Sequence, residues 1–161
     1  MSVVGQPRSY HKRFLFRVEV PGVAWAGFQK CGELKASTAV ISQWEGGGQL
    51  AWNAAYTSPG RVKTSDVTLE RGATSDLDLW RWYRQVSDAG AGVGAVDEAY
   101  KRSVQIVQLD RDGNELRRFA LRAAWPTEYS AGDRDNTADG NAVESLTLTY
   151  EYFELSDDRA A

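Results

Sequence analysis

The sequence predicts a mainly β domain with one short α-helix, arranged as a sandwich or partial barrel. Two observations predict this class. Apolar and polar residues alternate with a period of two in several segments of the 161 residues, as they do in half-buried strands. Only one segment, around residues 79–86, spaces its apolar residues as a helix does. A chain of this length can bury one core, so we expect a single domain over residues 1–161.

The N-terminal third of the sequence is predicted to form two extended segments and a long loop. Apolar residues alternate with charged ones over Phe14–Val20, which indicates a half-buried strand. Leu34–Trp44 is rich in Ser, Thr, Val and Ile, residue types that favour an extended segment. A run of three glycines at 46–48 then opens a loop that we expect to end near Pro59-Gly60.

A strand and a tight turn are predicted next. Val67 and Leu69 fall on one face of the strand, and three polar residues fall on the other: Asp66, Thr68 and Glu70. Gly72 suits a turn that requires a positive φ.

One helix is predicted over residues 74–88. Thr74 or Ser75 can cap it, and acidic residues at 76 and 78 suit the positive end of the helix dipole. Its apolar stripe consists of Leu79, Trp82, Tyr83 and Val86.

The C-terminal third predicts a hairpin and a closing strand. Val104–Leu109 and Leu116–Ala123 flank Asp112-Gly113-Asn114, which is a strong turn signal. In the closing strand, Leu146, Leu148, Tyr150 and Tyr152 oppose a polar set formed by Ser145, Thr147, Thr149 and Glu151.

Composition excludes several classes of protein. A net charge of −3 gives no general basic surface for nucleic acid. No apolar run approaches the ~20 residues of a membrane helix, and the first residues lack the pattern of a signal peptide. A single cysteine, Cys31, allows no internal disulfide and fits synthesis in a reducing compartment. We therefore expect no membrane insertion.

We find no catalytic, cofactor or metal site in the sequence. Gly46–Gly48 lacks the Gly-Lys-Ser/Thr that follows in a phosphate-binding loop. Asp110–Asn114 lacks the further oxygen ligands of a calcium loop, and the aspartates of 133–139 suit a solvated loop. His11 and Cys31 have no neighbouring partner for nucleophilic chemistry. An enzyme is not expected.

The tryptophans leave two functions open. Trp80 lies off the apolar stripe of the helix, and Trp44 and Trp52 flank the glycine-rich loop. Exposed aromatic residues at such places can anchor a neighbouring subunit. Alternatively, they can bind carbohydrate or protein, as in a monomeric β-sandwich recognition module.

The chain resembles the tail-tube proteins of contractile phage tails and phage-derived contractile injection systems, a family named after the T4 tube protein. Its members carry a strand ending in Leu-x-Arg-Gly and a helix similar to the one here, matched by Leu69–Gly72 and Thr74–Tyr83. Further matches follow in order: Phe14–Gly22, Ala26–Phe28, Trp44–Gly47, Val107–Glu115 with Ala124–Pro126, and Glu144–Leu148. The resemblance covers roughly residues 12 to 155, with a longer loop at 49–58 and an extension over residues 1–12 as departures.

The resemblance implies a structural subunit of the inner tube, without cofactor or enzymatic activity. Six copies would form a ring with a continuous luminal β-barrel, and rings would stack into a hollow conduit for DNA or protein. A sheath and baseplate or hub proteins would be partners. The subunit would be made in the bacterial cytoplasm and become part of a virion or an injection particle, which can be released. A tube-initiating paralogue near the baseplate remains open.

The same resemblance implies two groups of functional residues. The lumen candidates are Asp66, Glu70 and Glu151. Residues 46–63 would form an inter-ring loop, and the expected contacts between subunits or rings are Trp44, Gly46, Gly47, Gly48, Trp52, Tyr56, Pro59, Lys63 and Trp80.

Overall fold

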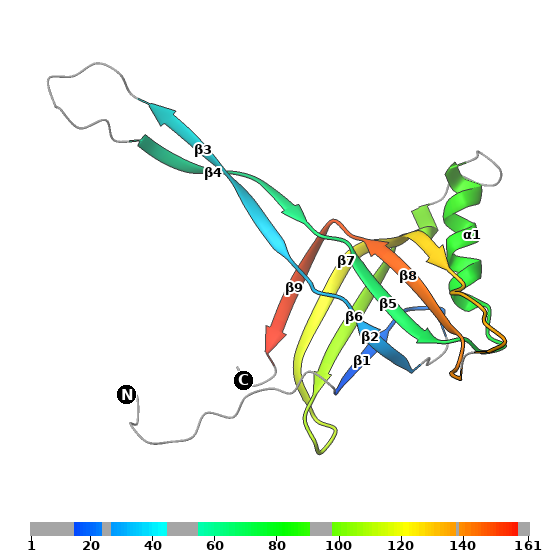
Figure 1. Ribbon diagram of the computed structural model, residues 1–161. Helices are drawn as coiled ribbons and strands as arrows, with labels where there is room; N and C mark the ends of the chain where they lie inside the picture. Colours follow the sequence, from blue (N-terminus) through cyan, green and yellow to red (C-terminus); the bar gives the residue numbers. More distant parts are fainter. Residues whose placement is uncertain (1–14, 24–26, 45–54, 91–97, 138, 158–161) are drawn as a thin grey trace, which may run out of the picture.

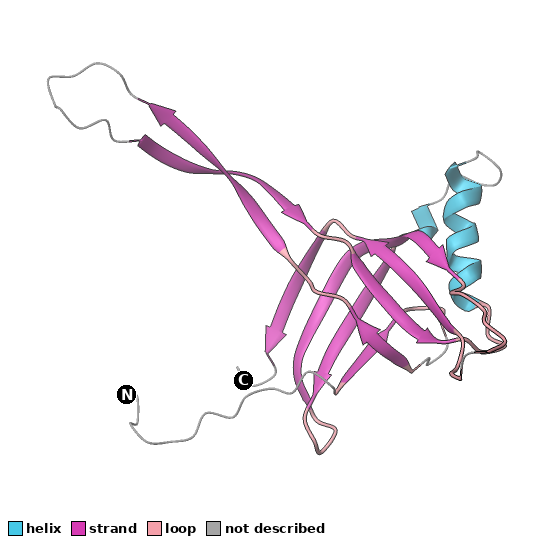
Figure 2. Ribbon diagram, viewed as in Figure 1, coloured by secondary structure: helices cyan, strands magenta, loops and turns pink. Residues whose placement is uncertain are grey.

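The computed structural model describes residues 15–23, 27–44, 55–90, 98–137 and 139–157 (Figures 1 and 2). These residues form nine β-strands, one α-helix and one short 3-10 helix. In chain order they are β1 Phe16–Glu19, β2 Phe28–Cys31, β3 Ala36–Trp44, β4 Ala55–Thr64, β5 Val67–Gly72, α1 Asp78–Gly90, η1 Glu98–Tyr100, β6 Arg102–Leu109, β7 Glu115–Ser130, β8 Val143–Thr149 and β9 Tyr152–Asp157. The mainly β class with one α-helix is confirmed.

Seven strands form one curved antiparallel sheet. The strand order is β1-β6-β7-β8-β5-β2, and β9 pairs with β7. The sheet curls into a partial barrel with α1 at one end, and β3 and β4 form a separate two-stranded hairpin that projects from the body (Figure 1).

β7 links the two halves of the sheet. Its first part pairs with β6 and β9, and its last part, from Trp125 onward, pairs with β8. Between these parts Ala123 has a φ of 53°, and the register with β6 shifts between Arg102 and Val104. This is a β-bulge, which bends a strand and increases its twist.

The core lies between the halves of the sheet and the helix. Alternation along β5 buries Val67 and Leu69, and alternation along β8 buries Leu146 and Leu148. Burying each such side chain stabilises the fold by roughly 1.5–3 kcal/mol. Leu79 and Trp82 enter the same cluster from α1 and Tyr83 packs against it, which confirms these three residues of the predicted stripe.

The helix begins later than expected. It starts at Asp78 instead of Thr74, because Asp76 supplies the cap: its Oδ1 accepts the Asp78 amide at 3.0 Å. Thr74 Oγ1 accepts the Asp76 amide at 3.2 Å and thereby closes the preceding turn. The Trp82 indole donates to the carbonyl oxygen of Tyr100 at 2.7 Å, which joins α1 to η1.

Three local predictions are wrong. Gly72 does not have a positive φ, because it continues β5 and pairs with Val143 of β8. Residues 55–63 are not part of a loop, because β4 pairs with β3 over its whole length. The closing strand stops at Thr149, and a turn at Tyr150-Glu151 carries the chain across to β9 on the other half of the sheet.

Candidate functional site

The β3–β4 hairpin is the most prominent surface feature of the described chain. Its strands pair with each other and with no described strand of the body. It carries apolar side chains in contact with solvent: Val40 is 69% exposed, Val62 65% and Tyr56 68%. An isolated two-stranded hairpin is at best marginally stable in water. The hairpin therefore has the properties of a segment that docks on another surface.

The two faces of the hairpin differ. Residues paired directly opposite each other share a face, so the first face contains Thr38, Val40, Ser42, Thr57, Pro59 and Val62. We call this the uncharged face. The second face contains Ser37, Ile41, Gln43, Tyr56, Ser58 and Lys63. Because β3 and β4 contain no acidic residue, their only charges are the positive ones of Arg61 and Lys63.

The predicted contact residues of this region fall into two groups. Trp44 ends β3 opposite Ala55, and Tyr56, Pro59 and Lys63 lie on β4. Gly46, Gly47, Gly48 and Trp52 lie outside the described residues. The structure thus brings four of the predicted contacts onto one projecting hairpin.

A second surface is the polar side of the sheet around β5 and β8. Thr68 lies opposite Thr147, with 3.2 Å between their hydroxyl oxygens, and Glu70 lies opposite Ser145 and Lys30. The pairing of β5 with β2 and of β8 with β7 extends this surface on both sides. We call it the polar face, and its polar residues are Lys30, Thr68, Glu70, Glu128, Ser130, Ser145, Thr147 and Thr149, with Trp125 opposite Thr149 at one end.

The three lumen candidates are not equivalent. Glu70 lies within the polar face, and Asp66 is exposed immediately before β5. Glu151 does not continue this face along β8, because it lies in the turn after that strand. Its carboxylate is 3.7 Å from the Lys101 ammonium, and its amide donates to the Arg122 carbonyl oxygen at 3.0 Å.

A buried ionic network lies on the opposite side of the same strands. Arg71 is only 2% exposed, and its Nε donates to Oε1 of the buried Glu144. Tyr129 Oη donates to the other oxygen of Glu144 at 2.8 Å. Arg71 Nη2 also donates to the Asp76 carbonyl oxygen at 3.3 Å, at the turn before α1. The network therefore fixes the start of the helix on the sheet.

The network changes the ionisation of Tyr129. Burial, and then the hydrogen bond to Glu144, raise the pKa of Tyr129 above its usual value. A raised folded-state pKa means that the neutral phenol stabilises the fold below the unfolded-state pKa of ~10. This stabilisation is lost as the pH rises through the folded-state pKa.

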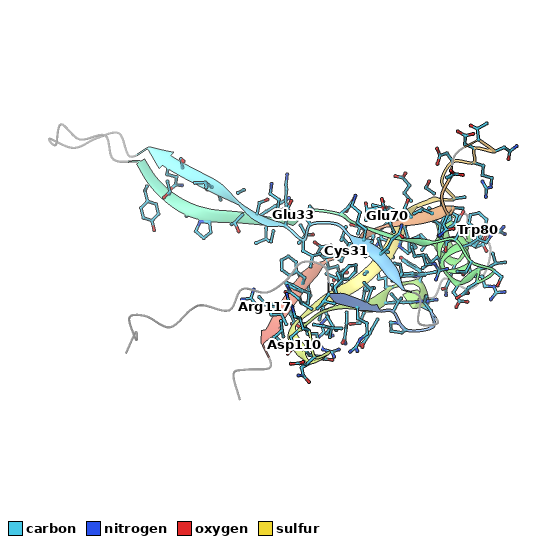
Figure 3. The ribbon with its side chains drawn as sticks, turned by 60° about the horizontal axis from the view of Figure 1, so that its bottom comes forward. Cys31, Glu33, Glu70, Trp80, Asp110 and Arg117 are labelled. Carbon is cyan, nitrogen blue, oxygen red and sulfur yellow. The ribbon has the colours of Figure 1, made fainter. Side chains whose placement is uncertain are left out.

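Trp80 belongs to an aromatic cluster on the helix. Its ring lies 5.8 Å from that of Tyr83 and 5.3 Å from that of Tyr129, between centroids. Trp80 remains 38% exposed, on the part of the body away from the hairpin (Figure 3). The cluster is thus separate from the other predicted contacts that lie on described residues.

The described residues contain no group of three His, Cys, Asp or Glu side chains that could hold a metal ion. Within the same part of the chain, no helix has the length and apolar character needed to span a bilayer.

Sequence reasoning missed two features of these surfaces. Val40 falls in an expected extended segment and Val62 in the expected loop, and only the structure shows that both are exposed on one hairpin. Glu144 was recognised as part of a strand but not as the partner of Arg71. The Leu-Glu-Arg-Gly sequence contained one signal that Arg71 is buried, because the alternation of the strand places Arg71 on the same face as Val67 and Leu69.

One protein family matches nearly the whole chain, and solved structures share its fold. Residues 12–154 match the family described as T4-like virus tail tube protein gp19. A protein in a sheath–tube complex of the PVC extracellular contractile injection system is 20% identical, with a TM-score of 0.74 over 96% of this chain and 94% of that one. A protein in the tube-terminating cap of the anti-feeding prophage is 17% identical, with a TM-score of 0.76 over 98% and 99%.

A solved structure with lower sequence identity also has a similar fold. Hcp1 from Flavobacterium johnsoniae is 14% identical, with a TM-score of 0.51 over 89% of this chain and 96% of that one. No curated protein matched significantly.

Proposed function

This chain belongs to the T4-like virus tail tube protein family, and from that premise we propose that its copies form hexameric rings that stack into a hollow conduit for DNA or protein. The family match favours a structural tube subunit over a tryptophan-based recognition module. The structural observation that carries the proposal is the projecting hairpin. A subunit that works alone gains nothing from an unpacked apolar arm, whereas an assembling subunit can bury it.

The hairpin is proposed as the contact between subunits or rings. Its Tyr56, Pro59 and Lys63, together with Trp44, supply the predicted contacts on described residues. Of the loop expected over 46–63, residues 55–63 belong to the second strand of this arm. Trp80 is proposed as a separate outer contact, because its aromatic cluster lies away from the arm.

The polar face is proposed as the wall of the channel. It is rich in Ser and Thr, and its charged residues are Lys30, Glu70 and Glu128. One positive and two negative charges, with Asp66 beside them, make the surface mildly acidic. A mildly acidic wall repeated around a ring does not hold a passing polyanion. Glu151, which lies in a turn, is proposed at the rim of this wall.

The partners and location follow from the assemblies that contain similar folds. These include a sheath–tube complex, a tube cap and a baseplate. We propose that a sheath surrounds this tube, that a baseplate starts it, and that the assembled particle is a phage tail or an injection system assembled in the bacterial cytoplasm. The subunit has no enzymatic role in this proposal, and it acts as a single domain.

Electron microscopy tests the assembly directly. Purified protein is expected to show rings and stacked tubes by negative-stain microscopy, and early elution in size-exclusion chromatography. Addition of carbohydrate or peptide is expected to leave tryptophan fluorescence unchanged. Folded protein that stays monomeric at high concentration would contradict the proposal.

Charge reversal tests the assignment of the lumen. Asp66→Lys with Glu70→Lys is expected to slow or block the passage of nucleic acid or acidic protein, because a basic wall attracts polyanions. Tubes should still assemble. The matched control is Asp112→Lys with Asp133→Lys, which changes the net charge equally at two exposed acids outside the polar face. Equal cargo delivery by both variants would show that the polar face does not line the channel.

A further inference from the structure

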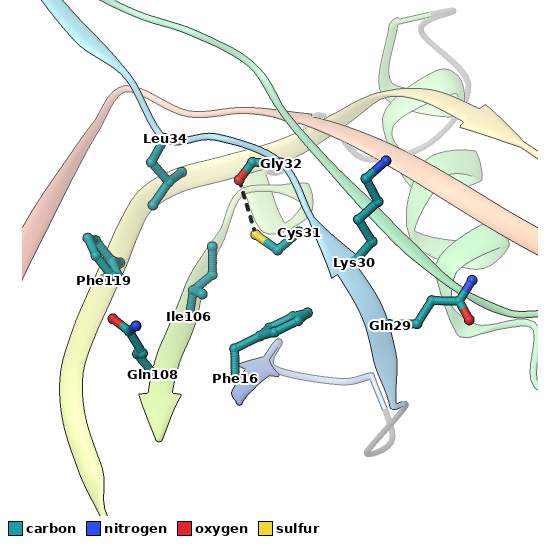
Figure 4. A pocket seen from close by; sticks show the side chains of 9 residues that line it. All are labelled: Phe16, Gln29, Lys30, Cys31, Gly32, Leu34, Ile106, Gln108 and Phe119. Atoms are coloured by element: carbon teal, nitrogen blue, oxygen red, sulfur yellow. Dashed lines mark hydrogen bonds between the residues drawn. The ribbon is translucent and has the colours of Figure 1, made fainter. Parts of the chain in front are cut away.

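An open pocket of about 620 Å³ lies among β1, β2, β6 and β7 (Figure 4). Its apolar lining comes from Phe16, Cys31, Leu34, Ile106 and Phe119. The polar residues among its described lining are two glutamines and one lysine, without an acidic residue (Gln29, Gln108 and Lys30). The pocket is therefore suited to apolar, uncharged side chains.

Two strand edges border this pocket. β1 and β2 are the first and last strands of the order β1-β6-β7-β8-β5-β2, so the described residues leave the outer edge of each unpaired. Unpaired edges can accept another strand, and natural proteins usually cover them. The body thus combines an apolar pocket with two strand edges that no described strand pairs.

The hairpin has the complementary properties. Its uncharged face presents Val40, Val62 and Pro59 between threonine and serine residues, and both valines are mostly exposed. β-Branched side chains on an extended ribbon pack well on an apolar surface between strands.

We propose that the uncharged face of the β3–β4 hairpin of one copy docks into the pocket between β1 and β2 of a second copy. This inference rests on the proposed tube function and identifies the site that accepts the arm. Phe16, Leu34 and Phe119 contact Val40 and Val62 of the incoming hairpin.

The geometry of the chain excludes its own hairpin as the occupant. Leu34 lines the pocket, and β3 begins two residues later and leads away from it (Figures 1 and 4). Val40 is six residues beyond Leu34, which corresponds to ~20 Å in a strand. The arm of each subunit is therefore carried away from its own pocket.

The contact is directional, because each copy offers one arm and one pocket at different places on its surface. Head-to-tail contacts of this kind generate either closed rings or open stacks. Every subunit in the interior of a tube then donates its arm and also receives one.

Cys31 provides a specific test, because it is the only cysteine of the chain and lines the pocket. The experiment introduces Val40→Cys or Val62→Cys, assembles tubes, and oxidises them with copper–phenanthroline. Burial raises the pKa of the Cys31 thiol to about 11, so little of it is ionised at neutral pH and the reaction depends on the thiolate of the introduced cysteine. The matched control is Ile41→Cys, which places the thiol on the second face of the same strand.

The expected result is a ladder of covalent oligomers on a non-reducing gel from the Val40 and Val62 variants. The ladder should disappear when Cys31→Ser is added, and Ile41→Cys should give little of it, because a disulfide requires Cβ atoms about 3.5–4.5 Å apart. Tubes that form without the crosslink, or that crosslink equally through Ile41→Cys, would refute the docking while leaving the tube function intact. Failure of the unsubstituted protein to assemble would refute both.

The N-terminal segment is the alternative occupant. Ser9→Cys would then crosslink with Cys31 within one chain, giving a monomer with altered mobility, and this result would overturn the proposal.

A second measurement does not involve cysteine. Val40→Asp should raise the concentration needed for assembly by roughly 10- to 100-fold or more, since it removes a buried valine and introduces a charge. Ile41→Asp should raise that concentration much less. Equal effects of the two variants would argue against docking through the uncharged face.

Discussion

Arg71→Met is expected to lower the free energy of unfolding by about 3–5 kcal/mol, because it leaves the carboxylate of Glu144 buried without its positive partner. The side chains of Arg71 and Glu144 are only 2% and 8% exposed, so water cannot replace the lost interaction easily. The melting temperature should fall by roughly 10 °C. Urea and thermal unfolding of dissociated subunits measure both quantities without a contribution from assembly.

The double variant Arg71→Met with Glu144→Leu is the control for this prediction. It replaces both charges with apolar side chains, and such replacements are often close to neutral. It should therefore recover most of the stability lost in Arg71→Met. If the single and double variants are equally unstable, packing of the arginine side chain is the cause, and the charge pair is not.

Removal of the β3–β4 hairpin is expected to abolish tubes while leaving a folded body. The Ser65 amide donates to the Lys35 carbonyl oxygen at 2.9 Å, so two glycines can join these residues in place of residues 36–64. The hairpin pairs with no described strand of the body, so the core of β5, β8 and α1 should be retained.

Circular dichroism and size-exclusion chromatography test the fold and the assembly of this deletion. We expect a spectrum typical of a β protein, cooperative unfolding and no stacked tubes in micrographs. Intact hairpins carrying substitutions on the second face, such as Ile41→Ser, control for changes in solubility. Normal tubes from the deletion would show that the hairpin is not the assembly element.

Local patterns predicted most of the body. The alternation in β5 and β8 and the stripe of α1 depend on residues a few positions apart, and they correctly identified Leu69, Leu146 and Trp82 as core residues. The Asp-Gly-Asn turn was also predicted correctly, since Gly113 has a φ of +84° between β6 and β7. Such features follow from side-chain periodicity and turn chemistry.

The second strand of the hairpin was missed because Pro59-Gly60 is typical of a loop. Proline lacks an amide hydrogen, and β4 tolerates it because only one edge of that strand is paired. A Cβ on Gly60 would lie 3.1 Å from the Ala39 carbonyl oxygen, so glycine permits the close approach of the two strands. Both residues therefore suit an irregular edge strand.

Long-range pairing could not be predicted from the sequence either. Arg71 and Glu144 are 73 residues apart, and no local pattern indicates that they meet. The pocket depends on the strand order of the sheet, which brings Phe16 of β1 near Cys31 of β2. Features of this kind follow from topology, which one sequence does not specify.

The continuity of β7 has a mechanical consequence for a tube subunit. Because one strand of 16 residues belongs to both halves of the sheet, a force applied to either half travels along unbroken covalent backbone to the other. Shear between the halves would have to rupture the ladder hydrogen bonds of β7 with β8, or those of β7 with β6 and β9, as well as sliding one layer of side chains over another. The bent strand thus makes each subunit resistant to deformation.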